Sequence, residues 1–345
     1  MKAAVLFKTG EPLKIIDGIQ MPSLQRGQVL VKISYSGICH SQLMEVNGDR
    51  GEDKWVPHLL GHEATGVVQS IGADVTRVKV GDKVILGWVK AKGLSVAGAK
   101  YQWNDQIINS GGVTTFSTHT IASEDRCYQL PEFIPMDVGV LFGCALPTGA
   151  GIVFNELKPE AGKTIVIFGL GGIGMSALIA SLSLNLKTVI AIDISDEKLK
   201  FAKNLGATET LLATRADLQE AVFKITEGQG VDYCVEAAGL TSTIEMAFSL
   251  LNPKSGKLIF ASHPKNGQKI SIDPYELISG KQIAGSWGGA FSPDQDIPRL
   301  AQLFLTKKES FLEMVEKRYR LDDINKALTD LANKKVVRPI IEMSL

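Results

Sequence analysis

A glycine-rich turn between an apolar strand and an apolar helix constrains the fold of this chain more than any other feature. The turn, Gly169-Leu170-Gly171-Gly172-Ile173-Gly174, follows the continuous apolar run of residues 164–168. Its first glycine permits a tight bend, its second lets a pyrophosphate approach the backbone, and its third lets the helix pack on the strand. Asp193 ends the next apolar strand about 20 residues further on, where an acid can bind the ribose hydroxyls. The pattern predicts a doubly wound parallel sheet that binds a dinucleotide.

Asp193 also predicts which dinucleotide is bound. Its carboxylate can accept hydrogen bonds from both ribose hydroxyls and would repel a 2′-phosphate, and no basic residue follows it directly (Ile194-Ser195-Asp196). We therefore expect NAD rather than NADP, with Lys198 within reach of the adenosine ribose. The alternative is that Asp193 only caps the following helix.

Length and composition exclude several other classes of protein. A chain of 345 residues is too long for one core and suits two domains. Lys plus Arg and Asp plus Glu both number 37, so we expect neither a nucleic-acid partner nor an anionic membrane surface. The four cysteines are far apart in the sequence, which predicts a reduced, cytoplasmic protein without a disulfide framework. Residues 164–186 carry no charge, but the clustered glycines favour strand, turn and helix over a membrane span.

A change in the pattern of predicted strands and helices divides the chain into two domains. Residues 1–150 contain short β-branched segments bounded by Gly, Pro or Asp, whereas residues 151–289 alternate strands with helices. The last segment, 290–345, holds helices and a final strand. We predict a β-rich domain of residues 1–150 with 290–345, and a Rossmann dinucleotide-binding domain of residues 151–289 inserted into it.

Three separated residues carry the chemistry: Cys39 in GICHS, His62 in GHEATG and Cys144 in FGCALPTG. Two thiolates and one imidazole form the protein part of a catalytic zinc site, which keeps a fourth position open. This donor set is the known one of alcohol dehydrogenases, so the sequence matches an established pattern. A lone cysteine is more often a small buried apolar residue, and we interpret Cys127 and Cys234 in that way.

On these motifs the chain resembles the zinc-dependent medium-chain alcohol dehydrogenase family over essentially its full length. The resemblance implies a GroES-like catalytic domain and a Rossmann domain, with Cys39, His62 and Cys144 as zinc ligands and Glu63 as a nearby carboxylate. It also implies a homo-oligomer, dimer or tetramer, with residues 286–289 near the subunit contact. The further roles it implies are Ser41 at the substrate oxygen, His40 at the pyrophosphate, Arg338 at the phosphates, Thr148 near the nicotinamide, and Trp88, Phe116, Ser262 and Ser286 lining the substrate pocket.

The sequence departs from the family pattern at three places. The lobe of residues 88–112, where the family holds a second zinc with four cysteines, contains no cysteine, so we expect one zinc per chain. Gln42 stands where many members have an aspartate that orients the ligand histidine; its amide oxygen can still accept the imidazole N–H. Met44 stands where some members have a proton-relay histidine.

We therefore predict reversible oxidation of a primary or secondary alcohol by hydride transfer to NAD. Two pocket serines leave a polyol or sugar-alcohol dehydrogenase as the alternative, unless both hydroxyls only satisfy backbone groups. From another class, a non-catalytic NAD-binding structural or sensor protein is possible, because fold does not fix function.

Overall fold

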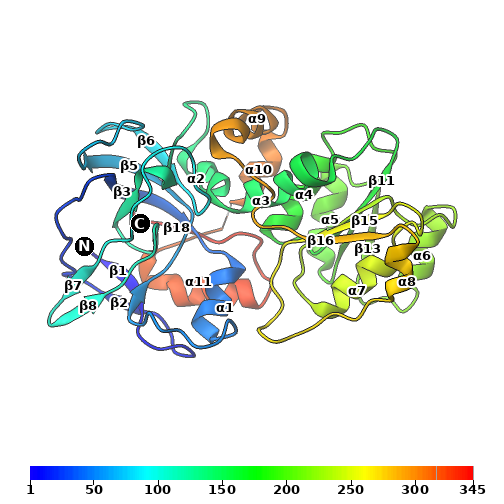
Figure 1. Cartoon of the computed structure of the whole chain (residues 1–345), viewed down its shortest axis with the longest axis horizontal. Helices are drawn as coiled ribbons and strands as arrows, with labels where there is room; N and C mark the ends of the chain where they lie inside the picture. Colours follow the sequence, from blue (N-terminus) through cyan, green and yellow to red (C-terminus); the bar gives the residue numbers. More distant parts are fainter. Residues whose placement is uncertain (316, 345) are drawn as a thin grey trace. The chain divides into compact units, whose positions relative to one another are not determined.

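The computed structural model describes residues 1–315 and 317–344, and the chain divides into two compact units (Figure 1). Unit 1 comprises Met1–Cys144 with Ser292–Leu345, and unit 2 comprises Ala145–Phe291. Both termini therefore belong to unit 1, and unit 2 is an insertion.

Unit 1 is built on sheets whose strands pair antiparallel, except that β17 and β18 are parallel. One sheet has the order β2-β1-β4, and a second has the order β10-β6-β5-β3-β18-β17 with β9 also paired to β3. Strand β3, Gln28–Gly37, is the longest and pairs with β5, β9 and β18. The other strands are β1 (Ala3–Leu6), β2 (Lys14–Ile16), β4 (His58–Leu59), β5 (Ala64–Ile71), β6 (Lys83–Leu86), β7 (Tyr101–Trp103), β8 (Gln106–Ile108), β9 (His119–Ser123), β10 (Cys127–Gln129), β17 (Arg318–Tyr319) and β18 (Ile340–Glu342).

The helices of unit 1 are short and connect these strands. Helix α1, His40–Asn47, follows directly on β3 and ends at Gly48, whose φ of 76° is a left-handed C-cap. The remaining helices are α2 (Met136–Gly139), α9 (Pro293–Thr306), α10 (Lys308–Met314) and α11 (Ile324–Ala332), with 3₁₀ turns at Glu124–Arg126, Val140–Gly143 and Leu321–Asp323.

Unit 2 is a six-stranded parallel sheet of order β13-β12-β11-β14-β15-β16. In chain order this is 3-2-1-4-5-6, the doubly wound arrangement that binds dinucleotides, so the predicted Rossmann fold is confirmed. The strands are β11 (Thr164–Phe168), β12 (Thr188–Asp193), β13 (Glu209–Leu212), β14 (Tyr233–Glu236), β15 (Lys257–Phe260) and β16 (Gln282–Gly285). The helices are α3 (Ala145–Gly151), α4 (Gly172–Ser181), α5 (Asp196–Leu205), α6 (Leu218–Ile225), α7 (Thr241–Ser249) and α8 (Pro274–Ile278), and a π-helix covers Ile152–Leu157.

The uncharged segment 164–186 forms β11, the glycine turn and the buried helix α4, as the glycines predicted. Among the described residues no single helix is long and apolar enough to cross a membrane. Only the bent helix pair Met136–Gly143 and Ala145–Leu157, taken together, reaches that length and composition.

Candidate zinc and dinucleotide sites

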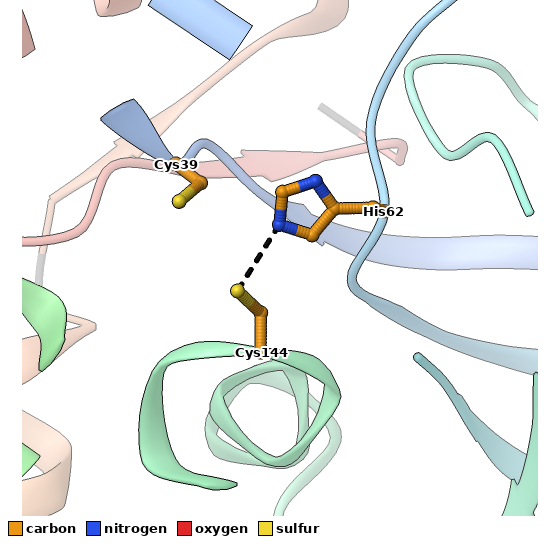
Figure 2. A group of neighbouring side chains, drawn as sticks. All are labelled: Cys39, His62 and Cys144. Atoms are coloured by element: carbon orange, nitrogen blue, oxygen red, sulfur yellow. Dashed lines mark hydrogen bonds between the residues drawn. The ribbon is translucent and has the colours of Figure 1, made fainter. Parts of the chain in front are cut away.

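Cys39, His62 and Cys144 lie together in unit 1, and their side chains point toward one another (Figure 2). Their donor atoms all lie within 4.8 Å of one another, and His62 Nε2 is 3.1 Å from Cys144 Sγ. Both sulfurs are buried, with Cys39 8 % and Cys144 6 % exposed. Three separate chain segments therefore bring two sulfurs and one imidazole nitrogen to one point.

Local backbone structure explains how each donor is placed. Cys39 is the N-cap of α1, so the turn from β3 into this helix sets its position. His62 follows Gly61, whose φ of 89° favours glycine. A Cβ on Gly61 would also lie 2.3 Å from Thr115 Oγ1. Cys144 directly follows the 3₁₀ turn Val140–Gly143.

Gln42 holds two of the three donors. Its Oε1 accepts the backbone N–H of Cys39 at 2.9 Å, and its amide nitrogen contacts Nδ1 of His62. In this structure the amide oxygen faces the Cys39 N–H and the amide nitrogen faces the ring, so a bond from the imidazole N–H to the oxygen stays a prediction. An imidazole that ligates metal through Nε2 carries its proton on Nδ1, so the amide nitrogen is the less suitable neighbour for the metal-bound ring.

The two thiols differ in acidity. The pKa of Cys39 is held well below its usual value, chiefly by its hydrogen bond with the Cys144 thiol, with help from Arg338 and His62 against the effect of burial. The pKa of Cys144 lies well above its usual value because it shares its proton in that bond and is buried. The pair therefore shares one tightly held proton, and a cation bound by both sulfurs would displace it.

Glu63 and Arg338 form a buried ion pair beside the sulfurs. Their side chains are 0 % and 4 % exposed, and Arg338 Nη2 lies 2.5 Å from Glu63 Oε1. Burial raises the pKa of Glu63 despite the guanidinium, whereas the acidic neighbours keep the pKa of Arg338 well above its usual value against burial. The resemblance implied a phosphate partner for Arg338. The structure gives it Glu63, which no local sequence signal indicated, and the phosphate contact stays a prediction.

The other predicted residues of unit 1 have varied surroundings. Ser41 Oγ is buried and has no hydrogen-bond partner among the described residues, while His40 is exposed. Trp88 is half-buried, and its backbone N–H lies 3.4 Å from the carbonyl of Gly143. Phe116 is 1 % exposed and packs in the core with Leu60 and other apolar side chains, so its predicted place in the substrate pocket is not supported.

In unit 2 the glycine turn has the geometry that a phosphate site needs. A Cβ on Gly174 would lie 1.7 Å from the carbonyl oxygen of Gly169, and Gly169 itself has a φ of 83°. A Cβ on Gly171, the N-cap of α4, would meet nothing within 4 Å. Helix and strand are thus in close contact while the N-terminus of α4 is open, as an anion requires.

Asp193 links this turn to the next helix. Its Oδ2 accepts the N–H of Leu170 at 2.6 Å, and its Oδ1 accepts the N–H of Ser195 at 2.9 Å. The N-cap of α5 is Ser195, which accepts the N–H of Lys198. The alternative that Asp193 is the helix cap is therefore wrong, and each of its oxygens keeps a lone pair for a ligand.

The remaining predicted residues of unit 2 are partly engaged. Thr148 is buried in α3 and Lys198 is half-buried at the start of α5. Ser262 Oγ donates to the carbonyl of Ala237, and Ser286 Oγ donates to Glu156 at 2.6 Å. Both hydroxyls thus have protein partners, which favours the structural interpretation of these serines.

Glu236 was missed by the sequence analysis. It ends β14, is fully buried, and its Oε1 accepts the N–H groups of Ala238 and Gly239. Burial raises its pKa, although these bonds oppose the effect. The signal was present, because Glu236 ends an apolar strand as Asp193 does.

Comparison with known proteins agrees with this geometry. The alcohol dehydrogenase GroES-like domain matches residues 25–132, and the zinc-binding dehydrogenase domain matches residues 172–306. The chain is 30 % identical to alcohol dehydrogenase class-3 of Zea mays over 372 residues, covering 100 % of the chain and 97 % of the relative. It is 29 % identical to S-(hydroxymethyl)glutathione dehydrogenase of Synechocystis, covering 99 % of both.

Solved structures show the same fold. An alcohol dehydrogenase zinc-binding domain protein from Burkholderia ambifaria has a TM-score of 0.90 at 28 % identity, covering 99 % of this chain and 98 % of that one. Benzyl alcohol dehydrogenase from Acinetobacter calcoaceticus has a TM-score of 0.89 at 27 % identity, covering 99 % of both. Fold and site together define a zinc-dependent oxidoreductase. The chain belongs to the zinc-dependent medium-chain alcohol dehydrogenase family, as its motifs indicated.

Proposed function

We propose that this enzyme oxidises a primary or secondary alcohol reversibly, with one zinc held by Cys39, His62 and Cys144 and with NAD as hydride acceptor. The convergence of these three donors within 4.8 Å carries the proposal, because three protein ligands leave one tetrahedral position for substrate. In this proposal unit 1 is the catalytic domain and unit 2 the nucleotide-binding domain.

Zinc, when bound, supplies a Lewis acid that lowers the pKa of an alcohol, and NAD supplies the hydride acceptor. The residues of the chain supply the proton path and the positioning. Ser41 Oγ is buried and has no partner within the described residues, so it can accept a hydrogen bond from the substrate hydroxyl and relay its proton while giving up its own. Met44, which is 6 % exposed, offers no titratable group for a further relay. In this proposal Ser41 would hold the alcohol proton at its Oγ and pass it on toward bound cofactor and solvent.

The choice of NAD rests on Asp193. Its carboxylate lies at the end of β12, beside the glycine turn that would hold the pyrophosphate. A 2′-phosphate there would face a negative charge with no nearby compensating cation in the sequence 194–196.

The substrate is proposed to be a simple alcohol. The similar proteins include dehydrogenases named for benzyl alcohol and for S-(hydroxymethyl)glutathione, which differ widely in polarity. Within this chain the engaged hydroxyls of Ser262 and Ser286 offer a polyol little free hydrogen-bonding capacity. The polyol alternative therefore has weaker support.

Metal content and assembly complete the proposal. The lobe of residues 88–112 has no cysteine, so we assign it no zinc.

The edge of the parallel sheet supports a homo-oligomer. Around β16, the edge strand, Ile278 and Trp287 are 82 % and 75 % exposed, and apolar side chains exposed at a sheet edge favour contact with a second chain. None of the four cysteines forms a disulfide, which suits the reducing cytoplasm.

The test is NADH formation by the zinc-loaded enzyme with matched primary alcohols, secondary alcohols and polyols. We expect turnover with simple alcohols and its loss in Cys39→Ala and Cys144→Ala, whereas Cys127→Ala, a buried cysteine away from the site, keeps it. A preference for polyols would reverse the substrate assignment. Zinc-edge X-ray absorption should show two sulfur neighbours per zinc, and elemental analysis that gives two zincs per chain would contradict a lobe without zinc.

A further inference from the structure

A second group of metal-ligating side chains lies in unit 1, apart from the two sulfurs. Glu45, Asp53 and His58 each offer one donor atom, and these atoms all lie within 4.8 Å of one another. Glu45 is on α1, Asp53 is in the segment that follows this helix, and His58 opens β4. Beside them is a cavity of about 240 Å³ lined by Glu45 and residues 50–55.

The hydrogen bonding of His58 determines which ring nitrogen is free. Its Nδ1 lies 2.9 Å from the carbonyl oxygen of Leu59, which can only accept, so Nδ1 carries a proton. In the neutral ring Nε2 then presents a lone pair. A ring fixed by Nδ1–H to a backbone carbonyl is the usual arrangement of a metal-ligating histidine.

That lone pair faces other acceptors. His58 Nε2 lies 2.8 Å from Asp53 Oδ2 and 4.0 Å from Glu45 Oε1, and the His58 side chain is only 8 % exposed. A lone pair opposed to a carboxylate oxygen is unfavourable unless a cation lies between them, and burial increases that cost. The site therefore requires either a proton on Nε2 or a metal ion.

The distances suit a metal ion. Bonds of about 2.1 Å place neighbouring octahedral donors about 3 Å apart and opposite donors about 4.2 Å apart. The two observed separations, 2.8 Å and 4.0 Å, lie close to these values. The surrounding charges are mixed: Arg50 lies 3.9 Å from the other oxygen of Glu45, and Glu52 and Lys54 line the cavity.

We propose that Glu45, Asp53 and His58 bind a divalent transition-metal ion that is distinct from the catalytic zinc. One imidazole and two carboxylates favour an ion such as Mn²⁺ over Mg²⁺ or Ca²⁺, which prefer oxygen donors alone. The ion would join α1, whose N-cap is Cys39, to the segment that leads to His62. It would therefore stabilise the region that carries two of the zinc ligands.

The experiment is a titration with Mn²⁺ of enzyme that carries one zinc per chain, following the electron paramagnetic resonance signal of free Mn²⁺. The soft thiolate site keeps its zinc against this hard ion. We expect one bound Mn²⁺ per chain, with affinity reduced at least about tenfold by Glu45→Gln or Asp53→Asn. Glu52→Gln is the matched control, because Glu52 lines the same cavity outside the triad, and its affinity should be unchanged.

Bound Mn²⁺ should also broaden the ring resonances of His58 in the wild type. Absence of binding up to about 1 mM Mn²⁺ would overturn the proposal and leave a proton as the cation at His58. An equal loss in Glu52→Gln would also overturn it, because the binding would then be a general property of an acidic surface. Neither result depends on alcohol oxidation, so the proposed function is tested separately.

Discussion

Glu124 is the residue whose replacement most directly tests how the lobe of residues 88–112 is held without cysteines. It is 1 % exposed, and its Oε1 accepts the N–H groups of Thr76 at 2.7 Å and Arg77 at 2.9 Å. Its Oε2 accepts the N–H of Leu94 in the lobe at 2.7 Å. One carboxylate thus connects the lobe to the turn that precedes β6.

We predict that Glu124→Gln lowers the stability of unit 1 by about 3 kcal/mol. The isosteric amide keeps one oxygen as an acceptor, but its NH₂ group then faces a buried backbone N–H, which loses its partner. An unsatisfied buried donor costs about 1–3 kcal/mol, and the cost is larger where the lost acceptor was charged. For a unit of about 200 residues, about 2–4 °C per kcal/mol gives a fall in Tm of roughly 6–12 °C. Differential scanning calorimetry of the zinc-loaded protein measures it.

The pH dependence provides a second, independent readout. Burial by itself would raise the pKa of Glu124, but the N–H groups of Leu94, Thr76 and Arg77 outweigh it and hold the pKa below its usual value. A lowered native pKa contributes stability above the unfolded pKa of about 4.3, and this stability is lost as pH falls through the native pKa. The Tm difference between wild type and variant should be constant from about pH 6 to 8 and shrink below about pH 4.

The exposed residue Glu132 supplies the control, since Glu132→Gln removes a carboxylate of the same unit that is not buried. Its Tm should stay within about 1 °C of wild type. The reasoning would be refuted if Glu124→Gln had the same Tm as Glu132→Gln. It would also be refuted if the Tm difference between Glu124→Gln and wild type stayed unchanged below about pH 4.

Three further predictions concern the sites themselves. Gln42→Glu should tighten zinc binding roughly tenfold in chelator competition, because its carboxylate can accept both the Cys39 N–H and the Nδ1–H of His62; unchanged or weaker binding would contradict this. Arg338→Met leaves Glu63 as an unpaired buried charge and should cost about 3–5 kcal/mol by calorimetry, with partial recovery when Glu63→Gln is added; a double variant as unstable as the single one would disprove the coupling. Asp193→Asn should raise the ratio of kcat/KM for NADP over NAD at least about tenfold, since it removes the charge that repels the 2′-phosphate, and an unchanged ratio would exclude that role.

Local patterns were sufficient for the dinucleotide-binding unit. The turn at Gly169 and Gly174 is required by contacts within a few residues, so the spacing of the glycines carries the information. The strand order of the sheet follows from a small set of doubly wound topologies. The sequence alone could not decide whether Asp193 or Ser195 caps the following helix, because both side chains accept hydrogen bonds and they lie two residues apart. The backbone path decides, and Ser195 is the cap.

The surroundings of the three candidate zinc ligands could not be predicted from local sequence patterns. The ligands themselves could be recognised by their neighbours in sequence, but the partner of Arg338 could not, because strand pairing brings distant residues together. β18 pairs with β3 so that Ile340 lies opposite Gly37, and the N–H of Ile38 donates to the carbonyl of Pro339 at 3.0 Å. This register places Arg338 beside Glu63 and the sulfurs.

The same pairing explains the glycine at position 37, two residues before Cys39. A Cβ at Gly37 would lie 2.1 Å from Glu63 Oε1, so only glycine leaves room for the carboxylate that pairs with Arg338. The buried ion pair therefore depends both on the pairing of β18 with β3 and on the absence of a side chain at Gly37. The positive charge of Arg338, just before β18, in turn helps to lower the pKa of Cys39, which lies about 300 residues earlier in the sequence.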